Sequence, residues 1–224
     1  DAVLTHSLAE ADYLRREAPG IHAHVVPWAL QAAPRAVPFD QRRGIAFVGG
    51  MRHAPNPDAV RWMAAEVLPR VWARDPAMLC LLVGADWPEL MWGRIDPRLQ
   101  LTGQVEKLDM VFDLVRLTVA PLRFGAGVKG KVLDSFAAGL PCVMTPIAAE
   151  GIPLDDVLRS AVTGDPAAMA DLICDMHDQA PLHDAQVQAG LALIRNVYTE
   201  DAVTAALETV VGVGGPREGI ATQV

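Results

Sequence analysis

The sequence has few basic residues, and it contains no apolar stretch long enough to cross a membrane. Lysine and arginine total 19, against 27 aspartate and glutamate residues among 224, so the formal net charge is −8. Proteins that bind nucleic acid or an anionic membrane surface usually carry a basic face, so this balance argues against both partners. Any anion site must therefore be local. A bilayer-spanning helix needs roughly 18 or more consecutive apolar residues, and the sequence has no such run.

Cysteine is also scarce. The three cysteines, Cys80, Cys142 and Cys174, lie far apart inside apolar stretches. Their spacing fits no metal site, and an odd number argues against a disulfide framework. We therefore expect buried free thiols in a protein of the reducing cytoplasm.

Apolar residues nonetheless make up 51% of the chain. This is enough for a sizeable core and excludes wholesale disorder. The chain begins with Asp-Ala-Val-Leu and enters an apolar strand pattern at once. That start favours a piece of a longer protein over an ordinary boundary from which a short leader was removed.

Alternating strand and helix patterns run along the chain. Short apolar runs predict strands at residues 2–5, 22–26, 45–48, 78–83, 99–102, 117–122 and 142–145. Helical spacing and capping residues predict helices at 8–17, 58–71, 108–114, 131–138, 165–177, 182–196 and 199–211. Strands that alternate with helices over short connections predict an α/β fold with a parallel, doubly wound sheet.

Two local features lie before the repeated pattern. Ser7 and Glu10 form a predicted capping box, in which the hydroxyl and the carboxylate satisfy opposite backbone donors. After residue 26 the periodicity stops, and Pro27, Pro34 and Pro38 follow one another. Such a stretch predicts a linker between domains that ends near residue 43.

A glycine-rich loop between a predicted strand and a predicted helix is the strongest candidate site. Ligands of doubly wound sheets bind beyond the carboxyl ends of the strands, and this loop lies there. Gly125, Gly127 and Gly130 expose backbone N–H groups, and the following helix adds its positive dipole end. The cations between residues 114 and 133 are Arg116, Arg123, Lys129 and Lys131, and no acid interrupts them before Asp134. The loop is thus interpreted as a phosphate site, the alternative being a glycine-rich turn with solvated lysines.

The same loop matches a second pattern. Gly125-x-Gly127-x-x-Gly130, with Glu150 about twenty residues later, has the spacing of the dinucleotide fingerprint. That fingerprint belongs in the first strand–helix turn of its fold, whereas this loop follows the fourth strand of its domain. An NAD-dependent oxidoreductase is therefore the weaker alternative. Asp134, one turn into the helix, is placed either to reach a ribose diol or to compensate the helix dipole.

Two longer stretches carry a family resemblance. They are FVGGMRHAPNPDAV at residues 47–60 and VAPLRFGAGVKGKVLDSFAAGLP at residues 119–141, supported by 82–84, 101–105 and 145–151. In this order they resemble the C-terminal, donor-binding half of retaining glycosyltransferases of family 4, or group 1. The resemblance implies two Rossmann-like domains in the GT-B arrangement and sugar transfer with retention from a nucleotide-diphosphate sugar. It implies neither a cofactor nor an obligatory metal.

The resemblance also implies a role for particular residues. Lys129, Lys131 and Asp134 are the implied catalytic residues, with the two lysines stabilising the leaving diphosphate. The implied diphosphate site is formed by Gly50, Arg52, Gly125, Ala126, Gly127, Val128, Lys129, Gly130 and Lys131. The implied base and ribose contacts are Gly84, Gly103, Val105 and Asp134, and the possible donor-sugar contacts are Glu150 and His53.

The sequence departs from the family pattern at four positions. Ala126 stands where the first signature glutamate is expected, eight residues before Asp134, which puts recognition of the sugar hydroxyls in question. Gly50 and Asn56 replace the usual basic pair of the first loop, although Arg52 is close. Asp134 is one methylene shorter than the usual glutamate. A non-catalytic nucleotide-sugar-binding or interaction domain therefore remains an alternative.

The resemblance divides the chain into four parts. Residues 1–30 are the expected remnant of an N-terminal acceptor domain, 31–43 the linker, 44–198 the nucleotide-sugar-binding domain, and 199–224 a crossover helix with a flexible tail. The expected partners are the donor and the missing acceptor domain, with a peripheral membrane acceptor as a further option and no nucleic acid. The expected context is glycan or polysaccharide biosynthesis in the cytoplasm, or at the inner face of the membrane in the full-length protein. We expect the 224 residues alone to be inactive, because one wall cannot form a two-domain cleft.

Overall fold

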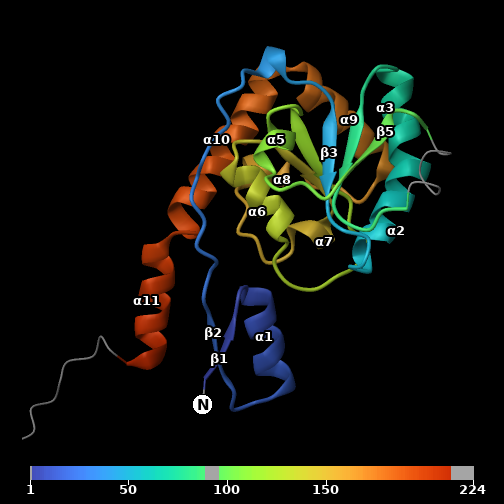
Figure 1. Cartoon of the computed structure of the whole chain (residues 1–224). Coiled ribbons are helices and arrows are strands. Elements are labelled where there is room, and N and C mark those ends of the chain that lie inside the picture. Colours follow the sequence, from blue (N-terminus) through green and yellow to red (C-terminus); the bar gives the residue numbers. More distant parts are fainter. Residues whose placement is uncertain (1, 89–95, 213–224) are drawn as a thin grey trace, which may run out of the picture.

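The computed structural model describes residues 2–88 and 96–212, and its centre is a parallel sheet of five strands (Figure 1). The strands are β3 (Ile45–Val48), β4 (Cys80–Val83), β5 (Leu99–Gly103), β6 (Leu117–Ala120) and β7 (Cys142–Met144). Their order in the sheet is β5-β4-β3-β6-β7. From β3 the chain first builds outward through β4 and β5, and it then returns to add β6 and β7 on the other side. The predicted α/β, doubly wound fold is confirmed, and its winding reverses between β3 and β6.

Helices cover both faces of this sheet. They are α2 (Pro55–Trp62), the π-helical turn η2 (Met63–Val67), α3 (Leu68–Arg74), α5 (Asp109–Phe112), α6 (Gly130–Ala137), α7 (Pro146–Ala149), α8 (Asp156–Arg159), α9 (Pro166–Asp178) and α10 (Ala180–Val197). Ile45 and Phe47 of β3 belong to the larger core, whereas Ala46 joins a smaller core with Val111 and Phe112 of α5. Successive residues of a strand point to opposite faces, so β3 is apolar throughout because both of its faces are buried.

A small lobe lies apart from the main sheet, at the bottom of Figure 1. It consists of β1 (Ala2–Thr5), α1 (Leu8–Glu17) and β2 (His22–Val25), with the two strands paired in parallel. The last helix, α11 (Glu200–Val211), runs from the end of α10 down to this lobe and contacts β2. Residues 213–224, the expected flexible tail, lie outside the described part of the chain.

The predicted linker has a defined path along the main domain. It includes a short 3₁₀ turn, η1 (Phe39–Gln41). At the end of α6, the Ala137 carbonyl accepts from the Ala33 N–H at 2.8 Å, and the Ala138 carbonyl accepts from the Arg35 N–H at 2.9 Å. The Arg35 guanidinium pairs with Asp113 at 2.8 Å and with Asp109 at 2.9 Å. Missing periodicity here therefore reflects an extended segment held by backbone bonds and ion pairs.

Several predicted element boundaries were wrong. The helix predicted to begin at Asp58 begins at Pro55, because proline fits the first turn of a helix, where its missing N–H has no partner to lose. The strand predictions at 78–83 and 117–122 were each two residues too long, and α7 and α8 were missed. Glu150 follows the last residue of α7.

The capping box at α1 forms only in part. The Ser7 hydroxyl accepts the Glu10 N–H at 3.2 Å, as predicted. The Glu10 carboxylate, however, accepts from the Ser7 hydroxyl at 3.1 Å instead of taking the reciprocal backbone bond. The carboxylate is thus held at one oxygen by a side chain.

The three cysteines are buried and free, as predicted. Burial raises the pKa of the Cys80 and Cys142 thiols to about 12, so both are inert core groups at neutral pH. Within the two described segments, none of the helices combines the length and the apolar character that spanning a membrane requires.

Packing of α6 against α10 depends on one aromatic side chain, Phe136, which is 1% exposed. A Cβ on Gly190 of α10 would lie 2.9 Å from its ring, so the two helices are in close contact there. We predict that Phe136→Ala lowers the free energy of unfolding by about 3–5 kcal/mol, because it leaves a cavity in the core. Denaturant titration measures this value. Phe124→Ala is the matched control: Phe124 is 46% exposed, so a similar loss there would contradict the assigned core.

Candidate functional site

Three loops meet beyond the carboxyl ends of β3, β4 and β6, where the winding of the sheet reverses. The Gly49 N–H donates to the Val83 carbonyl at 2.7 Å, and the Gly84 N–H donates to the Gly103 carbonyl at 2.9 Å. A Cβ on Gly84 would lie only 2.4 Å from the Gly49 carbonyl oxygen, so the two main chains almost touch. Open crevices of doubly wound sheets lie at this point, and here glycine backbone forms the crevice.

Lys131, in the first turn of α6, extends into this crevice. Its Nζ donates to Asn56 Oδ1 at 2.6 Å and lies 4.4 Å above the centre of the Phe47 ring. Asn56 in turn donates through Nδ2 to the Gly50 carbonyl at 2.8 Å, which ties the lysine to the first loop. Removal from water disfavours the charged ammonium and lowers the pKa of Lys131 to about 8. Among the described residues, no carboxylate forms an ion pair with it.

Lys129 has a different environment. Its side chain is 8% exposed, and its Nζ donates to the carbonyls of Gly125 and Gly127, the former at 3.3 Å. Glu150 lies 3.9 Å away. Burial lowers the pKa of Lys129, while the charges of Glu150 and Glu10 oppose that shift. Lys129 thus closes the glycine loop on itself.

The loop before α6 exposes main chain at two glycines. Gly125 and Gly127 have φ angles of +128° and +77°, which L side chains rarely adopt. Lys129 is the N-cap residue of α6 and makes no side-chain capping bond. The first N–H groups of α6 are therefore available to an anion, with the positive dipole end behind them.

Asp134 lies about one turn further along α6. Its side chain is half-buried, and within residues 2–88 and 96–212 its carboxylate makes no hydrogen bond or ion pair. Burial without a partner raises the pKa of Asp134. The carboxylate therefore keeps its acceptor positions free for a hydroxyl donor.

The predicted group of four cations was partly wrong. Arg116 lies at the opposite end of β6, where its guanidinium stacks on Phe39 at 4.0 Å and donates to the Phe39 carbonyl at 3.1 Å. Arg123 is near the site but pairs with Asp58 of α2, with its Nε 2.8 Å from the carboxylate. Lys129 and Lys131 are the two members that the loop brings together.

The other predicted residues surround the crevice at varying distances. Gly84 and Gly103 are joined by a backbone hydrogen bond, whereas Val105 packs against the smaller core. Arg52 is 86% exposed and pairs with Asp86 at 2.8 Å. His53 is an exposed loop residue.

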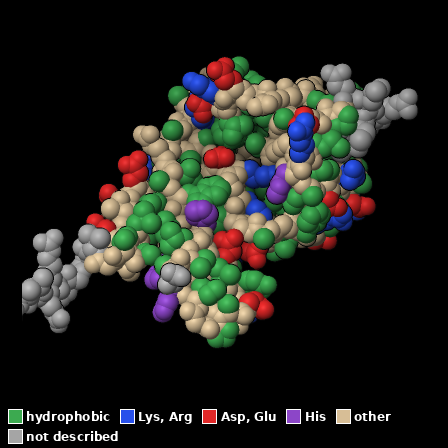
Figure 2. Space-filling view, turned by 60° about the horizontal axis from the view of Figure 1, so that its bottom comes forward, with side chains coloured by type: hydrophobic (Ala, Val, Ile, Leu, Met, Phe, Trp, Pro, Cys, Tyr) green, Lys and Arg blue, Asp and Glu red, His purple; other side chains and the backbone are tan. Residues whose placement is uncertain are grey.

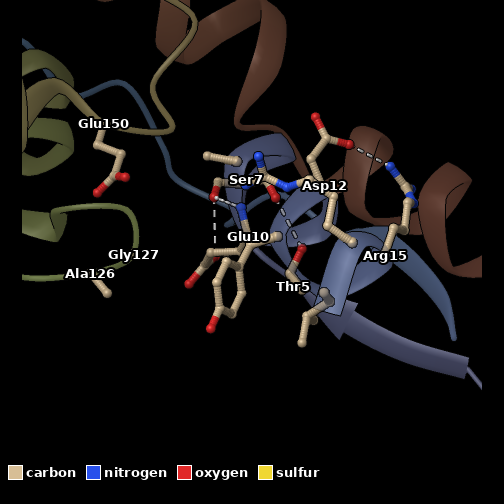
Figure 3. Close-up of a pocket in the computed structure, with 12 residues that line it drawn as sticks. Thr5, Ser7, Glu10, Asp12, Arg15, Ala126, Gly127 and Glu150 are labelled. Carbon is tan, nitrogen blue, oxygen red and sulfur yellow. Dashed lines mark hydrogen bonds and ion pairs between the residues drawn. The ribbon is translucent and has the colours of Figure 1, made fainter. Parts of the chain in front are cut away.

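A cleft of about 980 Å³ separates the glycine loop from the small lobe. Figure 2 shows blue basic atoms near the middle of this face, with red acidic atoms between them and the lobe. Ala126, Gly127 and Glu150 line one wall, and α1 forms the other (Figure 3). Sequence reasoning missed the α1 side chains, because Glu10 was interpreted only as a helix cap.

The close approach of the crevice loops can be tested with two glycines. Gly84 and Gly103 both have positive φ angles, +148° and +71°, but only Gly84 lies against backbone, since a Cβ on Gly103 would meet nothing within 4 Å. We predict that Gly84→Ala lowers the free energy of unfolding by about 1–3 kcal/mol more than Gly103→Ala does, the difference being steric overlap. Chemical denaturation of both variants measures this difference. Equal losses would refute the contact between the loops.

Comparison with known proteins places this geometry in a family. The sequence model of group 1 glycosyltransferases matches residues 42–179, more than half of the chain. No curated protein matches the sequence. Among solved structures, TarM of S. aureus superposes with a TM-score of 0.79 at 13% identity, over 95% of this chain and 43% of TarM.

Two further structures agree. HepE of Anabaena, in complex with UDP and glucose, has a TM-score of 0.73 at 12% identity, over 94% of this chain and 63% of HepE. WaaG, a glycosyltransferase of lipopolysaccharide biosynthesis, has a TM-score of 0.68 at 14% identity, over 93% of this chain and 62% of WaaG. The chain thus spans less than two thirds of each of these proteins, and at such identities the likeness shows the GT-B fold. On the family match, the chain belongs to the group 1 glycosyltransferases.

Proposed function

We propose that this chain is the donor-binding part of a retaining glycosyltransferase that uses a nucleotide-diphosphate sugar. The observation that carries the proposal is the Lys131 ammonium, which is withdrawn from water and has a neutral acceptor, Asn56, but no acidic partner in the described chain. The first turn of α6, which carries this lysine, has no side-chain cap on its N–H groups. A diphosphate supplies the missing negative charge and accepts from both kinds of donor.

In this proposal, residues 125–131 hold the diphosphate. The N–H groups of the loop and of α6 bind the phosphate oxygens, and Lys129 and Lys131 oppose their charge. As the bond to the sugar breaks, negative charge grows on the leaving diphosphate, and the fixed dipoles and the ammonium groups stabilise it. Electrostatic stabilisation of this kind supports transfer without an obligatory metal or other cofactor.

The remaining roles are those that the family resemblance implies. Asp134, with its free acceptors, binds the ribose hydroxyls. Gly84, Gly103 and Val105 border the base, and Gly50 and Arg52 flank the diphosphate. Glu150 and His53 contact the sugar.

The identity of the donor is supported by the structural neighbours. TarM and HepE have both been crystallised with UDP, and HepE also with glucose. UDP-sugars are therefore the first donors to test. Because the chain spans less than two thirds of these proteins, we propose that an acceptor-binding domain completes the enzyme and that these residues alone bind donor without transferring it. Glycan or polysaccharide synthesis in the cytoplasm, or at the inner membrane face, belongs to the same proposal.

Ala126 supports one competing function. It offers no carboxylate to the sugar, as a non-catalytic nucleotide-sugar-binding domain would allow. Full-length protein that binds a donor but neither hydrolyses nor transfers it would favour that role. An NAD-dependent oxidoreductase would prefer NAD over UDP in the same binding assay.

The two lysines give a direct test of the diphosphate site. We predict that Lys129→Ala combined with Lys131→Ala weakens binding of UDP at least about tenfold, on the order of 1.4 kcal/mol, because both cations are lost. Calorimetry with UDP-, GDP-, ADP- and dTDP-sugars measures the affinities and identifies the base. Arg195→Ala, an exposed cation on α10, is the control. Unchanged affinity of the double variant would refute the proposed site.

The lowered pKa of Lys131 makes donor binding dependent on pH. Without ligand this amine loses its proton above about pH 8, and a diphosphate favours the protonated form. Binding therefore takes up a proton at higher pH, and we predict that affinity for UDP falls by up to about tenfold per pH unit above pH 8. Calorimetry from about pH 7 to pH 9.5 measures the slope.

Alanine variants identify the group responsible for this slope. Lys131→Ala should bind UDP weakly with a flatter pH profile, whereas Lys129→Ala should retain most of the dependence. Cys142, whose pKa is about 12, stays protonated throughout this range. An equal slope in Lys131→Ala and the wild type would assign the titration to another group.

A further inference from the structure

Glu10 places a carboxylate on the wall of the cleft that faces the glycine loop. It lies on α1 of the small lobe, and its Oε2 accepts from the Ser7 hydroxyl at 3.1 Å. The other oxygen, Oε1, is directed toward the main domain, 3.3 Å from the position that a Cβ on Gly127 would take. One oxygen is thus fixed within the lobe, and the second is open to the cleft (Figure 3).

The lobe is packed against the main domain at Gly151, beside the cleft, so this position is defined. Ser7 is 2% exposed, and its Cβ lies 2.6 Å from the position that a Cβ on Gly151 would take. Val128 of the glycine loop also packs there, with its Cγ2 3.3 Å from the same point. Glu10 therefore reaches the glycine loop from a helix that is packed in place.

A second carboxylate lies across from it. Glu150, on the main-domain wall, has 47% of its side chain exposed and lies 3.9 Å from Lys129 Nζ. The charges of both glutamates act on Lys129, which shows that all three groups share one environment. Ala126, on the glycine loop that lines the same wall as Glu150, contributes no polar side chain.

This arrangement selects the kind of group that it can bind. Two carboxylates repel a phosphate, so the diphosphate belongs deeper, at Lys131 and α6. Hydroxyl groups, by contrast, donate to carboxylates in strong charge-assisted hydrogen bonds. A ligand with its phosphates at α6 and several hydroxyls toward the cleft satisfies both regions.

We propose that Glu10 binds hydroxyl groups of the donor's sugar from across the cleft and thereby determines which sugar is accepted. The inference rests on the proposed function, because it takes the diphosphate at α6 as given. The small lobe then contributes directly to donor recognition. It also supplies the carboxylate that position 126 lacks.

The test compares UDP with UDP-sugars in calorimetry on the 224-residue chain. Glu10→Gln keeps the size and the acceptor for Ser7 but removes the charge. For whichever of UDP-glucose and UDP-N-acetylglucosamine the wild type binds more tightly than UDP, we expect Glu10→Gln to reduce that advantage about tenfold. Affinity for UDP itself should be unchanged or slightly higher.

Two further variants sharpen the result. Glu17→Gln makes the same charge change at the exposed end of α1 and should leave the sugar advantage intact. Ala126→Glu added to Glu10→Gln should restore part of it, because it returns a carboxylate to the same region from the other wall.

The outcomes separate the inference from the proposed function. Absence of UDP binding by the wild type would refute the proposed function. UDP binding with no gain from either sugar, or an unchanged gain in Glu10→Gln, would overturn the role of Glu10 alone. An equal rise in affinity for UDP and UDP-sugar would show that Glu10 only repels anions, which also overturns it.

Discussion

The site depends on the cost of keeping one ammonium group out of water. Lys131 lies between the Phe47 ring and the Asn56 amide, a neutral surrounding that leaves its charge uncompensated and lowers its pKa to about 8. The fold maintains this state because the lysine lies in the first turn of α6 and its partners come from β3 (Phe47) and the first turn of α2 (Asn56). An anion that neutralises the ammonium recovers part of this cost, so affinity at this point is a property of the fold.

The sequence was sufficient to predict the sheet and the main loop, because both depend on local patterns. Periodicity and glycine spacing identified the loop before α6 and placed Lys129, Lys131 and Asp134 on it. Nearness in sequence was a less reliable guide to which of the four cations lie together at the site. A strand advances roughly 3.3 Å per residue. Arg116 precedes the four residues of β6 and the glycine loop follows them, so the two lie at opposite ends of the strand. Arg123 is paired with Asp58, and local patterns do not reveal a partner 65 positions away.

Glu10 shows a different limit of sequence reasoning. The Ser7–Glu10 spacing does describe a helix start, and the Ser7 hydroxyl caps α1 as expected. The position of Glu10 opposite Gly127, however, depends on the path of residues 26–44 between the lobe and the sheet. Backbone bonds from Leu30 to Tyr198 and from Ala33 to Ala137 set that path, each at 2.8 Å, and no periodic signal encodes them. The lobe is thus positioned by a segment that reads as irregular.

From the sequence, the three glycines of the loop are explained by exposure of backbone N–H groups. The structure adds two other reasons, backbone conformation and close packing. Gly125 and Gly127 adopt positive φ angles that shape the loop, whereas Gly130 does not. Gly130 is required by Trp28, which follows β2 and whose ring would lie 2.8 Å from a Cβ there. Trp28 also meets the edge of His6, next to the start of α1. The N-terminus of α6 therefore contacts Trp28, which in turn contacts His6 beside α1, so the position of the small lobe and the geometry of the anion site are set at the same turn of helix.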